Sequence, residues 1–186
     1  MVTVKVEQWS FEELLIVPNA PIDTDESAIE RSMGALGIRL PHDYLLFCDK
    51  YGSGSVFTAG KRFELISAGR VTYPDFVRDF SERQGQFRDA METHDVGLGL
   101  YPEKGGLLPF GKDDSGTYFC WDTHSSPDEW TVVVIWEYED DGFKRLNCSY
   151  SGFVCGLLKG SQPHPLWGKK WKPILPVDYL PEIFSC

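Results

Sequence analysis

The sequence is poor in the features that mark disulfides, metal sites and membrane segments. None of its five cysteines lies in a CxxC pair, and their odd number argues against a disulfide framework. Its four histidines have no second ligand at the local spacing typical of zinc sites. No run of 18 apolar residues predicts a membrane helix, and the N-terminus lacks the pattern of a signal peptide. We therefore expect a cytoplasmic protein with reduced thiols, no metal, no cofactor and no membrane partner.

Basic residues are also scarce, because 18 Lys and Arg stand against 28 Asp and Glu, which gives a net charge of −10. This charge repels phosphate backbones, so we do not expect direct binding to nucleic acid. A basic protein partner would instead be attracted, with a fast and salt-sensitive association. Negative charge also keeps proteins soluble, so the charge permits a basic partner without establishing one.

Apolar spacing predicts four helical segments along the chain. They cover residues 26–36, 41–51, 74–92 and 149–160. Gly37 is expected to end the first helix, whose buried stripe would be Ile29, Met33 and Leu36, and Ser149 or Ser151 is expected to cap the last. Gly85 weakens the third segment, which leaves two helices or one bent helix open. Residues 9–16 carry both strand and helix signals.

The remaining pattern is that of a sheet. Short strands are predicted at 56–58 and 62–66, and four further strands at 107–110, 116–121, 131–136 and 143–147. Residues 132–136 are apolar at every position, which predicts a central strand covered on both faces. Asp140-Asp141-Gly142 predicts a hairpin turn directly after it. The fold class is therefore α+β, a single domain with a largely antiparallel or mixed twisted sheet flanked by helices.

One row of residues has the chemistry of a cysteine hydrolase. Cys120, Asp122 and His124 alternate, so on one strand they would share a face. A strand spaces such residues roughly 6–7 Å apart, and no oxyanion loop is recognisable nearby. We therefore predict a buried Cys120 and no catalytic residue.

Acidic residues cluster in turns. Asp113-Asp114-Ser115-Gly116 lacks the ligand spacing of a calcium loop and is interpreted as a turn, in which Asp bonds the local backbone and Gly takes a positive φ. The predicted hairpin tip places Tyr138 among four carboxylates, which suits either a solvated turn or a contact for a basic partner. These carboxylates are Glu137, Glu139, Asp140 and Asp141; a second acidic region comprises Glu12, Glu13, Asp23, Asp25, Glu26 and Glu30.

Two segments carry a family resemblance. They are LGIRLPHDYLLF at 36–47, running on to YGSG at 51–54, and LLPFGKDDSGTYFCWD at 107–122. In this order they resemble the SUKH superfamily, which includes fungal cell-wall-synthesis regulators and bacterial toxin-immunity proteins. The resemblance covers residues 27–160 and leaves a segment 1–26 and a Pro/Trp-rich arm 161–186, expected to pack through Trp167, Trp171 and Phe184 within the same domain. The chain departs from the family at 51–54, where Asn-Gly-Gly is frequent, and by an insertion at 63–105.

The resemblance implies a binding protein that is not an enzyme. The first hypothesis is a bacterial immunity protein that neutralises a cognate, basic toxin domain such as a nuclease. Its expected contacts are Tyr138, Glu139, Asp140 and Asp141, with Asp113 and Asp114 as a second choice. A regulatory scaffold of the cell-wall type is the alternative, and the cysteine hydrolase is a third. The toxin and the oligomeric state are left open.

Overall fold

The computed structural model describes residues 15–16, 26–51, 54–58, 61–64, 75–93, 97–136, 142–159 and 177–181. It contains helices α1 (Glu26–Leu36), α2 (His42–Tyr51), α3 (Asp75–Thr93) and α4 (Tyr150–Lys159), and a 3-10 turn η2 (Pro127–Glu129). The strands are β1 (Leu15–Ile16), β2 (Gly54–Thr58), β3 (Lys61–Glu64), β4 (Leu107–Asp113), β5 (Tyr118–Asp122), β6 (Thr131–Ile135), β7 (Phe143–Leu146) and β8 (Val177–Pro181). The predicted α+β class is confirmed.

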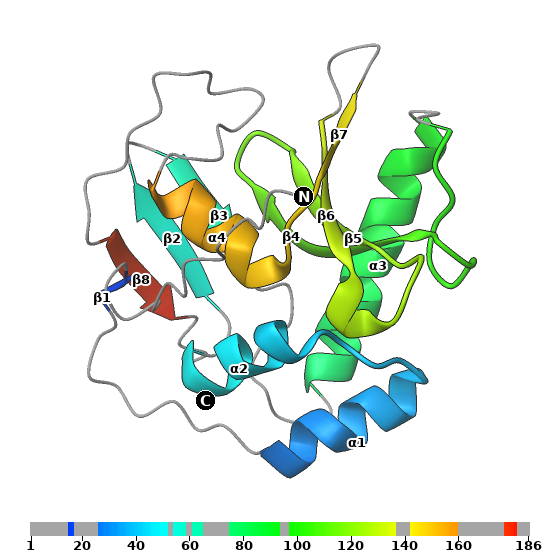
Figure 1. Ribbon diagram of the computed structural model, residues 1–186, viewed down its shortest axis with the longest axis horizontal. Coiled ribbons are helices and arrows are strands. Elements are labelled where there is room, and N and C mark those ends of the chain that lie inside the picture. Colours follow the sequence, from blue (N-terminus) through cyan, green and yellow to red (C-terminus); the bar gives the residue numbers. More distant parts are fainter. Residues whose placement is uncertain are drawn as a thin grey trace, which may run out of the picture.

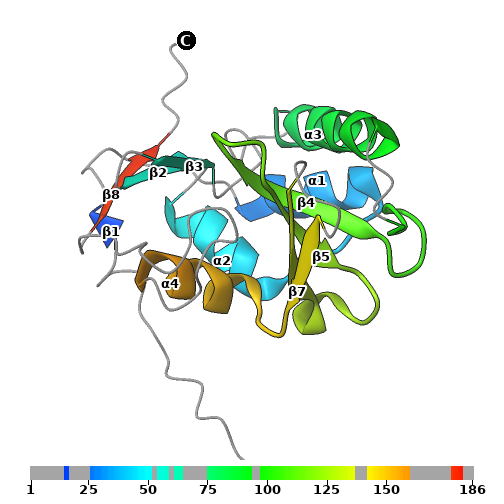
Figure 2. The ribbon, with the colours of Figure 1, turned by 90° about the horizontal axis from the view of Figure 1, so that it is seen from above.

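The strands form one sheet in the order β1-β8-β2-β3-β4-β5-β6-β7 (Figure 1). The β1–β8 pair is parallel and every other pair is antiparallel, so the sheet is mixed. Viewed from above, α3 lies on one side of the sheet, while α2 and α4 lie on the other (Figure 2). The prediction of a largely antiparallel or mixed sheet flanked by helices is therefore confirmed.

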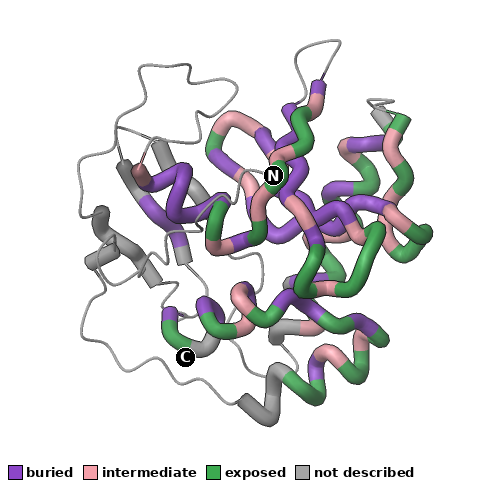
Figure 3. Tube along the Cα trace, viewed as in Figure 1, coloured by how far each residue is buried: buried purple, intermediate pink, exposed green. Residues whose placement is uncertain are grey.

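Strand β6 is buried on both faces, as its apolar run predicts. Val132 and Val134 belong to the cluster under α2 and α4, whereas Val133 and Ile135 pack with Phe87 of α3. The tube view shows this purple, buried strand inside the molecule (Figure 3). Alternate side chains of one strand thus enter two separate cores, which requires helices on both sides of the sheet.

Aromatic residues hold α2 and α4 onto the sheet. Tyr44 of α2 lies edge-on to Trp121 of β5 at 4.9 Å and to Tyr150 of α4 at 5.1 Å between ring centroids. Phe110 of β4 packs against Trp121 at 4.7 Å. Edge-to-face and tilted pairs of this kind add to the stabilisation from buried area. Much of the high aromatic content therefore lies in the core.

The ends of α1 and the length of α3 follow from local sequence. Gly37 has φ 63°, and Ile38 N–H donates to the Met33 carbonyl at 3.1 Å, which closes α1 as predicted. Met33 and Leu36 pack against the core, while the side chain of Ile29 lies outside the described part. α3 is a single helix that passes through an exposed Gly85, which resolves the two alternatives.

Carboxylates from distant parts of the chain occupy the N-termini of α2 and α4. Asp128 of η2 accepts the His42 backbone N–H at 2.8 Å. Asp43, in the first turn of α2, accepts Ser151 N–H at 2.9 Å and Ser151 Oγ–H at 2.8 Å. Ser149 is the N-cap of α4, since its hydroxyl accepts Gly152 N–H at 3.3 Å. Asp43 thus joins the two helices in addition to complementing the dipole of its own.

The sequence did not predict the two outermost strands on the β2 side. β8 is short and ends in Pro181, and it pairs with β2 through Ser55 opposite Leu180. β1 pairs with the other side of β8, so the ambiguous 9–16 segment is strand at Leu15–Ile16, and its residues 9–14 lie outside the described residues. The predicted packing through Trp167, Trp171 and Phe184 lies outside the described residues.

Replacement of Asp43 tests the link between α2 and α4. We expect Asp43→Ala to lower the free energy of unfolding by about 2 kcal/mol, because two donors of α4 lose a charged acceptor. Chemical denaturation of the full chain measures this loss. Asp128→Ala, which removes an exposed cap of α2 alone, should cost less. Equal stability of Asp43→Ala and the parent chain would contradict the assignment.

Candidate functional site at one end of the sheet

Two hairpin turns leave the sheet at the same end. Four residues form one row across four neighbouring strands, because each lies opposite the next. In order they are Lys112 of β4, Tyr118 of β5, Ile135 of β6 and Phe143 of β7. The turn after β4 and the connection from β6 to β7 therefore leave the sheet at the same end, although residues 137–141 of that connection lie outside the described residues. We call residues 113–117 and 137–141 together the acidic end.

Within the turn after β4, the two aspartates have different environments. Asp113 is buried, with 4% of its surface exposed, and its Oδ1 accepts Ser115 N–H and Thr117 N–H, both at 2.8 Å. Gly116 has φ 85°, as the turn interpretation predicts. Asp114 is exposed. Asp113 therefore shapes the turn, while Asp114 is the carboxylate that a partner can reach.

The turn after β6 is described only at its base. Trp136 N–H donates to the Gly142 carbonyl at 2.8 Å, and both residues are buried. β6 and β7 pair antiparallel on either side, so the predicted hairpin is confirmed. Tyr138, Glu139, Asp140 and Asp141 lie outside the described residues, and their role as contacts stays a prediction.

Most of the net negative charge comes from residues whose side chains lie outside the described part of the chain. Among side chains whose burial the structure describes, eleven are acidic and eleven are basic. Residues 137–141 hold four acidic side chains and no basic one, and residues 1–29 hold six against Lys5 alone. Of the second acidic region, only Glu30 has a described side chain, and it is exposed. The field that a basic partner would meet thus arises from a few segments.

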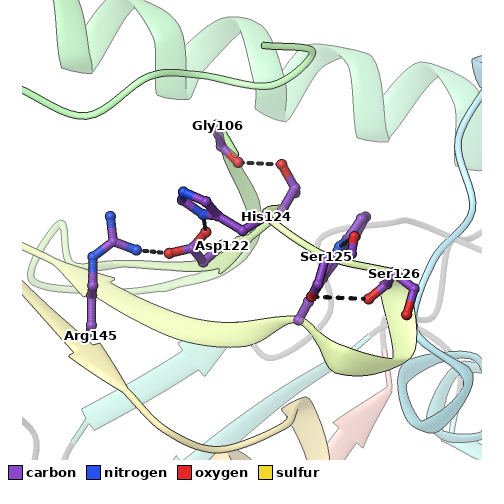
Figure 4. Close-up of polar contacts among 8 residues, drawn as sticks. Gly106, Asp122, His124, Ser125, Ser126 and Arg145 are labelled. Carbon is purple, nitrogen blue, oxygen red and sulfur yellow. Dashed lines mark hydrogen bonds and ion pairs between the residues drawn. The ribbon is translucent and has the colours of Figure 1, made fainter. Parts of the chain in front are cut away.

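The structure does not give Cys120 the environment of a catalytic nucleophile. Cys120 is fully buried between β4 and β6, and this burial raises the pKa of its thiol well above the ordinary value. Asp122 does pair with His124, through Oδ1 and Nδ1, but its Oδ2 pairs with Arg145 (Figure 4). A buried, protonated thiol cannot serve as the nucleophile of such a site.

Arg145 was missed by the sequence analysis. It lies on β7 opposite Val133, which itself lies opposite Cys120, so Arg145 shares the face that carries Asp122. The sequence signal that could have found it is the short turn between the predicted strands 131–136 and 143–147, because a short turn fixes which residues lie opposite each other. The pairing of Arg145 with Asp122 could be seen only in the three-dimensional structure.

Neither a metal centre nor a membrane helix is found in the part of the chain that the structure describes. No three His, Cys, Asp or Glu side chains gather closely enough to hold an ion there. None of the helices in those ranges is long and apolar enough to cross a bilayer. What the described residues do offer to a partner is the exposed Asp114 in the turn after β4.

The state of Cys120 can be tested by alkylation. Because burial raises the pKa of the Cys120 thiol, its thiolate fraction at pH 8 lies below that of an ordinary cysteine and its sulfur is shielded. We expect iodoacetamide to modify Cys120 at least about 100-fold more slowly in the native chain than in denaturant. Peptide mass spectrometry reads this directly, and comparable rates would revive the hydrolase hypothesis.

The different roles of Asp113 and Asp114 can be tested by measuring the stability of variants at each position. We expect Asp113→Ala to lower the free energy of unfolding by about 2 kcal/mol, because two backbone N–H groups lose their acceptor. Asp113→Asn keeps an acceptor oxygen and should restore most of the loss. Asp114→Ala, at an exposed position, should leave the denaturation midpoint nearly unchanged. A large loss in Asp114→Ala would contradict this division of roles.

Comparison with known families supports the fold-level interpretation. A family model described as SMI1-KNR4 cell-wall, SUKH_6, matches residues 26–154, from the start of α1 into α4. Searches of curated proteins and of solved structures found no match. Membership of this family supports a protein-interaction or immunity-type role in general. With more than half of its length matched, the chain belongs to the SUKH superfamily.

Proposed function

We propose that this chain is a bacterial immunity protein that binds a basic toxin domain through the acidic end of the sheet. The observation that supports the proposal is the row from Lys112 to Phe143, because the chain leaves the sheet at this end both after β4 and after β6. We infer that the two acidic turns, which are separate candidates in the sequence, act as one surface. The proposed contacts are Tyr138, Glu139, Asp140 and Asp141, with Asp114 beside them.

Hydrogen bonds anchor the base of this surface. Trp136 N–H donates to the Gly142 carbonyl at 2.8 Å, and the Asp113 carboxylate accepts backbone N–H groups of the turn after β4. An anchored base reduces the conformational freedom that a contact segment loses on binding. Tyr138 is also of a residue type that is enriched in binding hot spots.

Charge complementarity favours a basic partner. Four carboxylates within residues 137–141 would steer a cationic surface toward this end of the molecule. A toxin that acts on nucleic acid carries such a surface, because its substrate is a polyanion. Covering that surface would block the substrate, so neutralisation requires no chemistry from this chain. Family members are generally not enzymes, which agrees with this mode of action.

A regulatory scaffold is the second candidate. The description of the matching family as cell-wall related favours it. A scaffold would bind several partners with modest affinity, whereas an immunity protein binds one partner tightly. The number and affinity of captured partners therefore distinguish the two functions.

Charge reversal at the acidic end tests the interface. In the triple variant Glu139→Lys, Asp140→Lys, Asp141→Lys, we expect the Kd for the toxin domain to rise at least about 100-fold, because attraction becomes repulsion at the contact. The midpoint of thermal unfolding should stay nearly unchanged, since the buried base of the hairpin is intact. Titration calorimetry with a candidate toxin domain from a neighbouring gene gives the Kd, and scanning calorimetry of the variant alone gives the midpoint.

A second triple variant supplies the matched control. Glu30→Lys, Glu82→Lys and Glu92→Lys change the net charge equally, but these exposed residues lie on α1 and α3. We expect less than about a threefold rise in Kd, caused by weaker long-range steering. Equal weakening by both variants would show that only net charge matters. An unchanged Kd in the first variant would place the interface elsewhere.

Cell growth tests the biological role. We expect the toxin-like domain to arrest growth when it is expressed alone and growth to recover when this chain is co-expressed. Rescue should fail with the triple Lys variant of residues 139–141 and persist with the control variant. Rescue by neither the parent chain nor the control would reject that domain as the cognate toxin.

A further inference from the structure

We propose that His124 and Arg145, held by Asp122, form a second contact point that binds a carboxylate side chain of a partner protein. Both side chains lie on the face of the sheet that carries α3, at the end of β5 and on the edge strand β7. This contact is distinct from the acidic end and takes the opposite charge. It does not depend on the immunity function proposed above.

A nearly buried carboxylate organises the two donors. The side chain of Asp122 is 10% exposed, and its two oxygens pair with His124 Nδ1 and Arg145 Nη1. Figure 4 shows the two partners meeting Asp122 from different sides. Because both carboxylate oxygens are occupied, Asp122 fixes the orientation of the imidazole and of the guanidinium together.

The organised donors remain accessible. The side chain of His124 is 65% exposed and that of Arg145 is 45% exposed. Asp122 uses one nitrogen of each, so Arg145 retains Nε–H and Nη2–H as donors for a ligand, and His124 Nε2 donates as well when both ring nitrogens carry a proton. An arginine that is already held loses less rotamer freedom when a ligand binds. The arrangement is that of a preorganised binding contact.

The surrounding backbone fits around the imidazole. A Cβ placed on Gly105 would lie 2.8 Å from His124 Nε2 and 2.9 Å from the neighbouring ring carbons, so a larger residue there would displace the ring from its position. Thr123 Oγ1 donates to the Gly106 carbonyl at 2.7 Å and fastens this loop to the end of β5. The position of His124 is thus set by Asp122 on one side and by the loop on another.

The chemistry of the pair favours a carboxylate of a protein. Arg145 presents the planar donors that match a carboxylate, and the doubly protonated form of His124 adds one further donor. A polyanion such as nucleic acid would need a broad basic surface, whereas this contact is built on a single arginine, which suits a single carboxylate. Partly buried Phe143, also on β7, supplies apolar contact beside the pair. An acidic residue next to an aliphatic or aromatic one is the complementary sequence.

The test uses the full ¹⁵N-labelled chain and a capped peptide containing Glu-Phe-Glu. We expect saturable shifts of the Arg145 Nε–H and His124 ring signals on titration with this peptide. Arg145→Ala should weaken peptide binding at least about tenfold. Asp122→Asn should weaken it less and should broaden the Arg145 Nε–H signal, because Asp122 acts as a positioning residue.

Lys144 provides the matched control, since it is an exposed cation adjacent to Arg145 on the opposite face of the same strand. Lys144→Ala should change peptide affinity by less than about twofold. Equal losses in Lys144→Ala and Arg145→Ala would overturn the proposal in favour of general attraction. Absence of shifts, stronger binding of inorganic phosphate than of peptide, or shifts produced by protein concentration alone would also overturn it.

Discussion

The fold depends on one constraint, which is that β5 and β6 are apolar on both faces and must be covered on both. α2 and α4 cover one face through the aromatic cluster around Trp121, and α3 covers the other through Phe87 and Met91. Little of the sheet surface is then left for partners. Accessible polar groups remain at the turns, the strand ends and the edge strand β7, and both proposed contacts lie there.

Two aspartates attach α2 and α4 to other parts of the chain through hydrogen bonds. Asp43 and Ser151 are 108 residues apart in the chain, and Asp128 and His42 are 86 apart. Each pair places a carboxylate at a helix N-terminus, where backbone N–H groups lack partners within the helix. The positions of α2 and α4 are thereby fixed by directional bonds as well as by packing, which apolar contacts alone specify loosely.

Elements set by interactions between residues close in the sequence were predicted, whereas those set by contacts between distant segments were not. Gly37, Ser149 and the Gly142 hairpin act within a few residues, so local patterns identified the helices and β4 to β7. β8 was missed because its pairing with β2 joins segments more than 100 residues apart and Pro181 weakens its strand signal. At the sites, the turn of Asp113 was predictable, whereas the Asp122–Arg145 pair crosses from β5 to β7 and depends on the folded register. The contacts at residues 138–141 stay a prediction.

The place of β8 has a consequence for synthesis of the chain. β2 leaves the ribosome more than 100 residues before β8, yet β8 is the neighbour that pairs with its outer edge. At typical translation rates this interval lasts about ten seconds. During that time the outer backbone groups of β2 are free to pair with other strands. The edge of β2 is therefore covered by its partner only after residue 177 is made, even though the segments that form both cores are already complete.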